Sequence, residues 1–184
     1  MQLCDLLARM PTDTTAREPS VVGVDGGTAL WAFGALIVCK ANAKQTDGAL
    51  TLVEYTAPPG NESPFHVHHN EDELFYVLDG EIVCYYGDDA ENRIRAGSNE
   101  TVLLPRTVPH GFRVVGEETC RLLVQITPGG LEAFFAEVGT PATQRAPPPP
   151  PTEPNRPSES DVAAMTAAAE TYGIEILGPL PRED

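Results

Sequence analysis

The chain has 184 residues, of which 41% are hydrophobic, enough for one folded domain with a buried core. Twelve basic against 27 acidic residues give a formal net charge of −15, which disfavours binding to nucleic acid or to anionic membrane surfaces. No stretch reaches the roughly 18 consecutive apolar residues of a membrane span, and no basic segment followed by an apolar run marks a secretory signal, so we expect a cytoplasmic protein.

A short helix is predicted over residues 1–10, because four apolar side chains share one face of it, and Pro11 ends it. From residue 21 to 127 the pattern changes to short β-type runs separated by glycine. The predicted strands are Ala29–Cys39, Ala49–Thr56, Pro64–His68, Glu73–Leu78, Glu81–Tyr86, Thr101–Leu104, His110–Val115 and Cys120–Thr127.

Three turn signals separate these strands. Asp47-Gly48 and Asp79-Gly80 are typical of tight hairpins, and Gly87-Asp88-Asp89 is a third candidate. Short strands with tight turns and no intervening helix predict an all-β fold, an antiparallel sandwich or barrel. Three cysteines in these strands, Cys39, Cys84 and Cys120, are expected to be buried thiols, because no C-x-x-C pair exists.

Helical periodicity returns after the strands. Apolar side chains from Leu131 to Val138 recur at i, i+3, i+4 and i+7, which predicts an amphipathic helix that Gly139 ends. Five consecutive prolines at 147–151 predict a stiff linker. A second helix is expected over Asp161–Tyr172, and the apolar residues after it are expected to dock on the barrel or on a second subunit.

Histidines are few and three of the four are clustered. His66 and His68 stand at i and i+2 of a predicted strand, so both imidazoles project to one face. Glu73, at the start of the next strand, can complete that face. Such a pair is also compatible with ordinary exposed or hydrogen-bonded histidines. His69 points to the opposite face, where a structural role is expected, and Glu71 beside it is expected to be a turn and surface acid.

The spacing Gly60-x5-His66-x-His68-x4-Glu73-x6-Gly80 resembles the first motif of the cupin superfamily, without a gap. A second motif follows.

In that second motif Gly97 is followed by Pro105, which precedes His110 by five residues. Two positions depart from the usual pattern: Thr107 stands where the motif has glycine, and Val114 where it has asparagine. Both departures concern turn geometry rather than the identity of the ligands.

The resemblance covers about residues 25–140. It implies a cupin β-barrel (a double-stranded β-helix or jelly roll) that holds one divalent transition metal: Ni, Mn, Fe, Co, Cu or Zn. The ligands implied are His66, His68, Glu73 and His110.

The expected organisation is a single barrel domain with an N-terminal helix over residues 1–140, a proline-rich linker over 141–160, and a C-terminal helix and tail over 161–184. The resemblance also implies a homodimer, since cupins commonly exchange terminal strands or helices.

The pocket around the metal is expected to be apolar. Phe75 continues the inward parity of Glu73, and Phe112 follows His110 by two residues. Tyr55 is a further candidate for a substrate contact, although core packing explains each of these aromatic residues equally well.

Arg106 lies in the loop before the fourth ligand and could clamp an anionic group of the substrate; a solvated surface arginine is the alternative.

Among cupins, this chain resembles the single-domain quercetinases. The resemblance lies in the set of three histidines with one glutamate and in the segment at 127–142. We therefore expect a metal-dependent, quercetin 2,3-dioxygenase-like enzyme acting on a small aromatic or apolar substrate with O₂, in which Glu73 accepts a proton. One alternative is a non-redox isomerase, cyclase or decarboxylase for a polyketide-like or β-dicarbonyl compound. The other is a non-enzymatic ligand-binding cupin.

Overall fold

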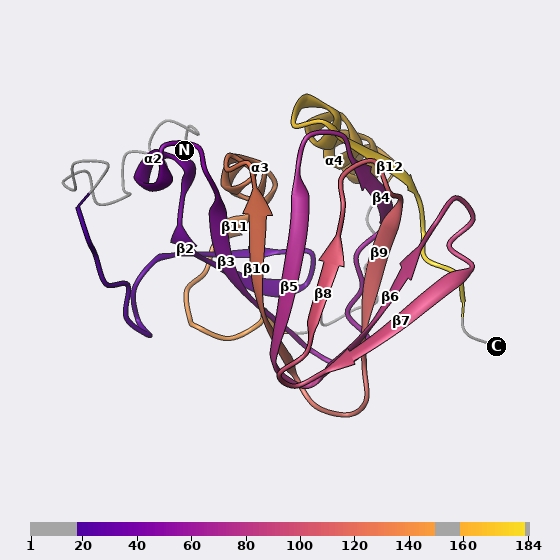
Figure 1. Ribbon diagram of the computed structural model, residues 1–184, viewed down its shortest axis with the longest axis horizontal. Helices are drawn as coiled ribbons and strands as arrows, with labels where there is room; N and C mark the ends of the chain where they lie inside the picture. Colours follow the sequence, from indigo (N-terminus) through magenta and orange to yellow (C-terminus); the bar gives the residue numbers. More distant parts are fainter. Residues whose placement is uncertain (1–17, 150–158, 183–184) are drawn as a thin grey trace.

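The computed structural model describes residues 18–149 and 159–182 and shows two antiparallel β-sheets packed into a jelly roll (Figure 1). The predicted all-β, antiparallel fold class is confirmed. Within the described ranges the strands hydrogen-bond in two separate sheets rather than in one closed cylinder. The helix predicted over residues 1–10 and the stretch 150–158 of the predicted linker lie outside the described residues.

The larger sheet has the order β11-β1-β2-β3-β10-β5-β8 and the smaller one β12-β4-β9-β6-β7. The strands of the larger sheet are β1 Thr28–Ala32, β2 Ala35–Ala41, β3 Thr51–Ala57, β5 Asp72–Asp79, β8 Thr101–Leu104, β10 Cys120–Thr127 and β11 Thr140–Pro141. Those of the smaller sheet are β4 Phe65–His68, β6 Glu81–Tyr86, β7 Asn92–Gly97, β9 His110–Val115 and β12 Ile174–Gly178. The helices are α2 Ala43–Thr46, α3 Glu132–Val138 and α4 Glu159–Thr171.

Strict alternation of side chains builds the core between the sheets. In β3 every second residue from Thr51 to Ala57 is buried, and β5 alternates in the same way. The inward side chains of both sheets meet in one cluster, to which Val77 and Leu122 contribute from the larger sheet and Ile82 and Val114 from the smaller. Cys84 and Cys120 are buried in this cluster and Cys39 packs against it; burial raises the pKa of all three thiols, so they remain protonated.

The predicted strand Ala29–Cys39 is two strands. Phe33 and Gly34, both at positive φ (54° and 75°), turn the chain between β1 and β2. Such turns usually carry asparagine or aspartate before the glycine, and the apolar run offered no such signal. Strand β7 was not predicted either, because four of its six side chains are exposed and no alternation marks it.

Two of the three turn signals do not form hairpins. Asp79-Gly80 carries the chain from β5 in the larger sheet to β6 in the smaller, so these strands do not pair. Asp47 ends α2 in the left-handed conformation. Strands β2 and β3 on either side of Asp47-Gly48 do pair, but α2 lies between them, whereas the segment from Gly87 to Asp89 joins the paired strands β6 and β7 directly. A local turn signal identifies a reversal of the chain but not the sheet that the next strand enters.

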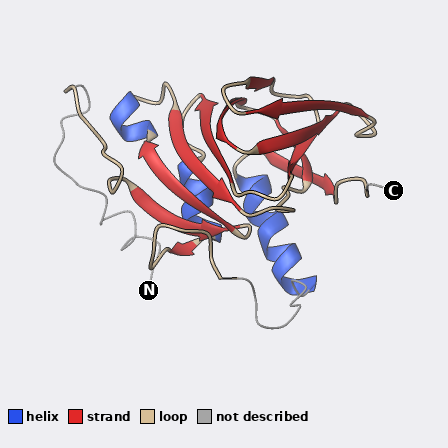
Figure 2. Cartoon of the chain, turned by 90° about the horizontal axis from the view of Figure 1, so that it is seen from below, coloured by secondary structure: helices blue, strands red, loops and turns tan. Residues whose placement is uncertain are grey.

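The C-terminal segment lies against the barrel. Strand β12 pairs antiparallel with β4, with Ile174 opposite His68 and Ile176 opposite His66 (Figure 1). Leu180 is buried on the other side of the smaller sheet, beside Phe65. Figure 2 shows α3 and α4 next to the strands. Within the described residues no helix is both long and apolar enough to cross a membrane.

A pair of glycine substitutions tests the crossover between the sheets. Gly80 and Gly116 have nearly the same φ (80° and 82°), but a Cβ at Gly80 would lie 2.8 Å from Cys120 Cα, whereas Gly116 faces open space. Both Gly80→Ala and Gly116→Ala incur the left-handed penalty of about 1–2 kcal/mol. We expect Gly80→Ala to lower the free energy of unfolding by roughly 1–3 kcal/mol more, measured by urea denaturation. Equal losses would show that the crossover is not tightly packed.

Candidate metal centre

Four polar side chains meet between the sheets. His66 and His68 project from β4 and His110 from the start of β9, all in the smaller sheet. His66 and His110 are register partners, which brings their imidazoles together. Glu73 comes from β5 in the opposite sheet, so the cluster joins both layers of the sandwich.

The four donor atoms converge. One imidazole nitrogen or carboxylate oxygen from each residue lies within 4.8 Å of the other three. The Nε2 atoms of His66 and His68 are 3.2 Å apart, and Glu73 Oε2 lies 3.2 Å from His110 Nε2 and 3.6 Å from His68 Nε2. His68, Glu73 and His110 are buried, and His66 is partly buried.

The neighbouring side chains in the cluster shift one another's pKa values. Burial alone would raise the pKa of Glu73, but His68, His110 and His66 lower it to about 2, so the carboxylate is ionised at neutral pH. Burial, followed by the neighbouring His110 and His68, lowers the pKa of His66 to about 3. Burial would also lower the pKa of His68, yet the Glu73 and Glu71 carboxylates raise it.

The outer nitrogens of two imidazoles are fixed by backbone carbonyls. His66 Nδ1 donates to Pro64 O at 2.8 Å, and His110 Nδ1 donates to Val108 O at 2.9 Å. Because each Nδ1 donates outward, each Nε2 faces the centre of the cluster, where the neutral ring can offer a lone pair to a cation. Three such nitrogens with one carboxylate oxygen are compatible with a first-row divalent metal.

The sequence reasoning missed the groups that hold the imidazoles. Glu71, expected at the surface, has a side chain only 12% exposed, and its Oε2 lies 3.5 Å from His68 Nδ1. Its i, i+3 spacing from His68 was the available signal. The two carbonyls belong to Pro64 and Val108, each two residues before its histidine, and no side-chain pattern reveals them.

His69 and Thr107 lie beside the cluster but are not part of it. His69 is half exposed and pairs with Glu175 at 3.1 Å, away from the cluster. Thr107, at the position of the motif's glycine, adopts φ 66°, the conformation that glycine accepts without strain. Its N–H donates to His68 O at 2.8 Å, which ties the loop before His110 to the end of β4.

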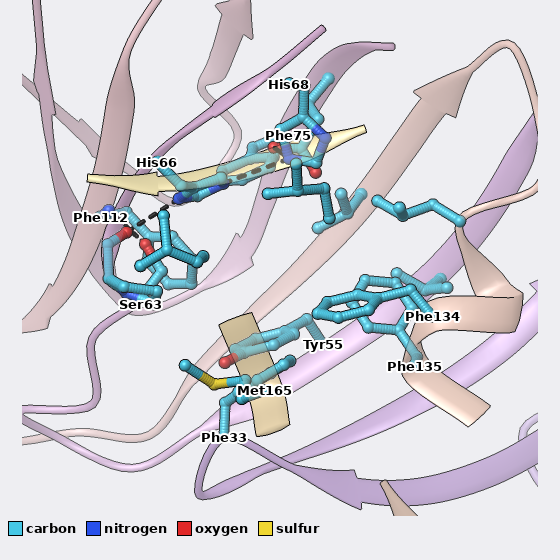
Figure 3. Close-up of a pocket in the computed structure, with 17 residues that line it drawn as sticks. Phe33, Tyr55, Ser63, His66, His68, Phe75, Phe112, Phe134, Phe135 and Met165 are labelled. Atoms are coloured by element: carbon cyan, nitrogen blue, oxygen red, sulfur yellow. Dashed lines mark hydrogen bonds and ion pairs between the residues drawn. The ribbon is translucent and has the colours of Figure 1, made fainter. Parts of the chain in front are cut away.

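A cavity of about 90 Å³ opens beside His66, His68 and Glu73 (Figure 3). The three predicted contacts Phe75, Phe112 and Tyr55 line it. Phe112 stands edge-to-face against both others, with ring centroids 5.4 Å from Phe75 and 5.6 Å from Tyr55. The cavity wall next to the cluster is therefore apolar and aromatic.

The side of the cavity away from the cluster is formed by the β1–β2 turn and by helices α3 and α4. Phe134 and Phe135 project from α3, Met165 from α4 and Phe33 from the β1–β2 turn (Figure 3). No lysine or arginine of the described chain lines the cavity. Hydroxyl groups are scarce there, and Tyr55 already donates to Asn61 Oδ1 at 3.1 Å.

The structure does not bring Arg106 to the cavity. Its guanidinium is 44% exposed and lies 2.9 Å from Asp72 Oδ2, and its backbone N–H donates to Asp72 Oδ1 at 2.8 Å. The arginine therefore joins the loop before His110 to the start of β5. This placement supports a surface ion pair and not an anion clamp.

Comparisons with known proteins agree with this architecture. Residues 53–126, which contain all four residues of the cluster, match the cupin domain family. Quercetin 2,3-dioxygenase of Bacillus subtilis (strain 168) is 29% identical over 101 residues, 55% of this chain but only 29% of that enzyme's length.

Two solved structures show the same fold. A predicted oxalate decarboxylase from Thermotoga maritima has a TM-score of 0.53 at 17% identity, covering 59% of this chain and 99% of that one. The polyketide cyclase RemF from Streptomyces resistomycificus has a TM-score of 0.50 at 26% identity, covering 60% and 80%.

Matched histidine substitutions test the cluster. We expect the wild type to bind one divalent metal per chain. Loss of a residue that only orients a ligand typically lowers metal affinity by up to roughly 100-fold, so His110→Ala, which removes a ligand itself, should lower it by more. His69→Ala removes an exposed imidazole outside the cluster and should leave affinity unchanged. Competition titration of Ni²⁺ or Co²⁺ against a chelator measures both. Retention of wild-type affinity by His110→Ala would contradict the assignment.

Proposed function

Because this chain belongs to the cupin superfamily, we propose that its three-histidine, one-glutamate cluster makes it a metal-dependent dioxygenase that cleaves a flavonol-like or other enolisable substrate with O₂. The fold alone does not select a reaction. The observation that carries the proposal is an ionised carboxylate, Glu73, at the end of an apolar cavity and within 4.8 Å of three imidazole nitrogens. The similarity to quercetin 2,3-dioxygenase supports the reaction class.

Under this proposal His66, His68, His110 and Glu73 hold one divalent ion. When bound, the metal supplies Lewis-acid stabilisation of the substrate anion and acidifies the hydroxyl that it polarises. The protein fixes the direction of each donor, because the Pro64 and Val108 carbonyls hold two imidazoles in one tautomer.

Glu73 is the proton acceptor. Its pKa of about 2 keeps the carboxylate free of a proton at neutral pH, so an oxygen is available for the hydroxyl proton of a bound substrate. Loss of that proton leaves an electron-rich enolate. The enolate supplies the electrons that reduce O₂: both oxygen atoms form bonds to carbon in the product, a ring carbon–carbon bond breaks, and the proton held by Glu73 returns to the product. No external reductant is required.

The cavity wall selects the substrate. A face of Phe75, Phe112 and Tyr55 excludes water and packs against an aromatic ring. Since no lysine or arginine of the described residues lines the cavity, a phosphate or carboxylate group on a substrate would find no positive partner outside the cluster.

Cavity size shows that entry of a flavonol requires movement. At about 90 Å³ the space is smaller than the roughly 150 Å³ cavity that accommodates benzene. Helix α4 is packed lightly against the rest of the fold, because Ala169 alone among its described side chains is buried. Its C-terminal end is held by Tyr172, whose hydroxyl donates to Glu137 Oε2 at 2.8 Å. We assign the opening to a displacement of α4.

A second candidate is a non-redox cyclase, isomerase or decarboxylase for a polyketide-like compound. The fold similarity to a polyketide cyclase and the apolar cavity favour it, and Glu73 could enolise such a substrate in the same way. Oxygen separates the two, since a dioxygenase stops under anaerobic conditions and a cyclase does not. A purely ligand-binding cupin would instead retain tight ligand binding after chelation of the metal.

Substitution Glu73→Gln tests the proton acceptor. The amide keeps the size and one oxygen but cannot accept the substrate proton, so we expect turnover per bound metal to fall by about 10²–10⁴-fold. An oxygen electrode with a panel of flavonols and diketones measures it, with metal content determined in the same samples. Turnover per metal equal to wild type would remove Glu73 from the mechanism.

Met165 provides a test of the movable wall. Met165→Trp fills the cavity and should lower kcat/KM for a flavonol by at least about tenfold, whereas Met165→Ala should favour bulkier substrates. Val162→Trp is the control, because Val162 lies on the same helix but is 45% exposed. Equal effects of the two tryptophan variants would show that α4 does not shape the substrate site.

A further inference from the structure

The three imidazoles of the cluster differ in what holds their outer nitrogen. The Nδ1 atoms of His66 and His110 donate to backbone carbonyls, which cannot be altered by a side-chain change. His68 Nδ1 faces a carboxylate oxygen of Glu71 instead. One of the three nitrogen donors is therefore oriented by an ionisable side chain.

The contact is buried and incompletely formed. The side chains of His68 and Glu71 are 2% and 12% exposed, and the two facing atoms, 3.5 Å apart, have no hydrogen-bond partner in the part of the chain that the structure describes. A hydrogen bond between nitrogen and oxygen has a length of about 2.7–3.2 Å, so a shift of a few tenths of an ångström completes it. Leaving two buried polar atoms unpaired is unfavourable, which drives that shift.

Other roles for Glu71 fit the geometry less well. Its carboxylate lies on the Nδ1 side of His68 and is not a member of the group of four donors, so it is not a ligand. The nearby guanidinium of Arg106 is engaged by Asp72. The backbone carbonyl of His68 accepts from Thr107 N–H, which fixes the main chain at this point but leaves the ring to be oriented by Glu71.

We infer that Glu71 is a positioning residue for the metal centre. It accepts the Nδ1–H of His68, selects the tautomer whose lone pair lies on Nε2, and increases the affinity of the site for a divalent cation. A carboxylate partner also makes the imidazole a more electron-rich ligand than a carbonyl partner does. This inference rests on the proposed metal centre but not on the identity of the substrate or on the use of O₂.

The test compares Glu71→Ala, Glu71→Gln and Glu175→Gln. Glu71→Ala removes the acceptor and should weaken Co²⁺ binding by about 10–100-fold. Glu71→Gln keeps an oxygen acceptor without the charge and should lose less. Glu175→Gln makes the same charge change beside His69, at the surface, and should stay within about twofold of wild type. Competition titration with Co²⁺ gives the affinities, and ¹⁵N NMR of the metal-free protein reports the His68 tautomer.

Wild-type affinity in Glu71→Ala, or an equal loss in Glu175→Gln, would overturn the inference while leaving the metal centre in place. An unchanged His68 tautomer in Glu71→Ala would overturn it as well. Failure of the wild type to bind Co²⁺, Ni²⁺ or any other divalent metal would instead overturn the metal centre itself, and this inference with it.

Discussion

The structure depends on one arrangement: three imidazoles from the smaller sheet meet a carboxylate from the larger sheet in the interior of the sandwich. Burying these groups is unfavourable unless each has a partner. Glu73 is ionised because three histidines surround it, and its field opposes the loss of charge on His68. The strand register, the crossover at Gly80 and the loop before His110 all serve to bring these side chains to one point.

Part of the cluster could be predicted from the sequence because its determinants are local. An i, i+2 pair of histidines on a strand shares a face whatever the rest of the fold does, and Glu73 follows on the next strand, but His110 was predicted only through the resemblance to the second cupin motif. Seven of the predicted strands agree with the structure within a few residues for the same reason, since alternation of side chains is a local pattern.

The features that were missed depend on tertiary contacts. Asp79-Gly80 marks a turn, but nothing local shows that β6 enters the other sheet. The position of Glu71 beside His68 requires the turn after β4 to fold back. The place of Met165 in the cavity wall requires α4 to pack beside α3, which ends 21 residues before α4 begins. Arg106 was a candidate substrate contact with a surface position as the alternative, and the structure shows it paired with Asp72 at the surface.

Chemistry and selectivity have different origins in this chain. The four donors lie within residues 53–126, the part that matches the cupin domain family, whereas Phe33, α3, α4 and β12 lie outside it. These outer elements supply much of the cavity wall. Strand β12 also pairs with β4, which carries two of the donors, so the C-terminal segment contacts both the cavity and the backbone of the cluster. The shared fold thus carries the candidate metal centre, and the added segments carry much of the wall of the cavity beside it.

Anomalous diffraction from crystals grown with Ni²⁺ or Co²⁺ shows whether the four side chains share one ion. We expect one strong peak at the absorption edge of the metal, about 2.0–2.2 Å from Nε2 of His66, His68 and His110 and from a carboxylate oxygen of Glu73. A peak only at surface groups such as His69, or four side chains too far apart to share one ion, would contradict it.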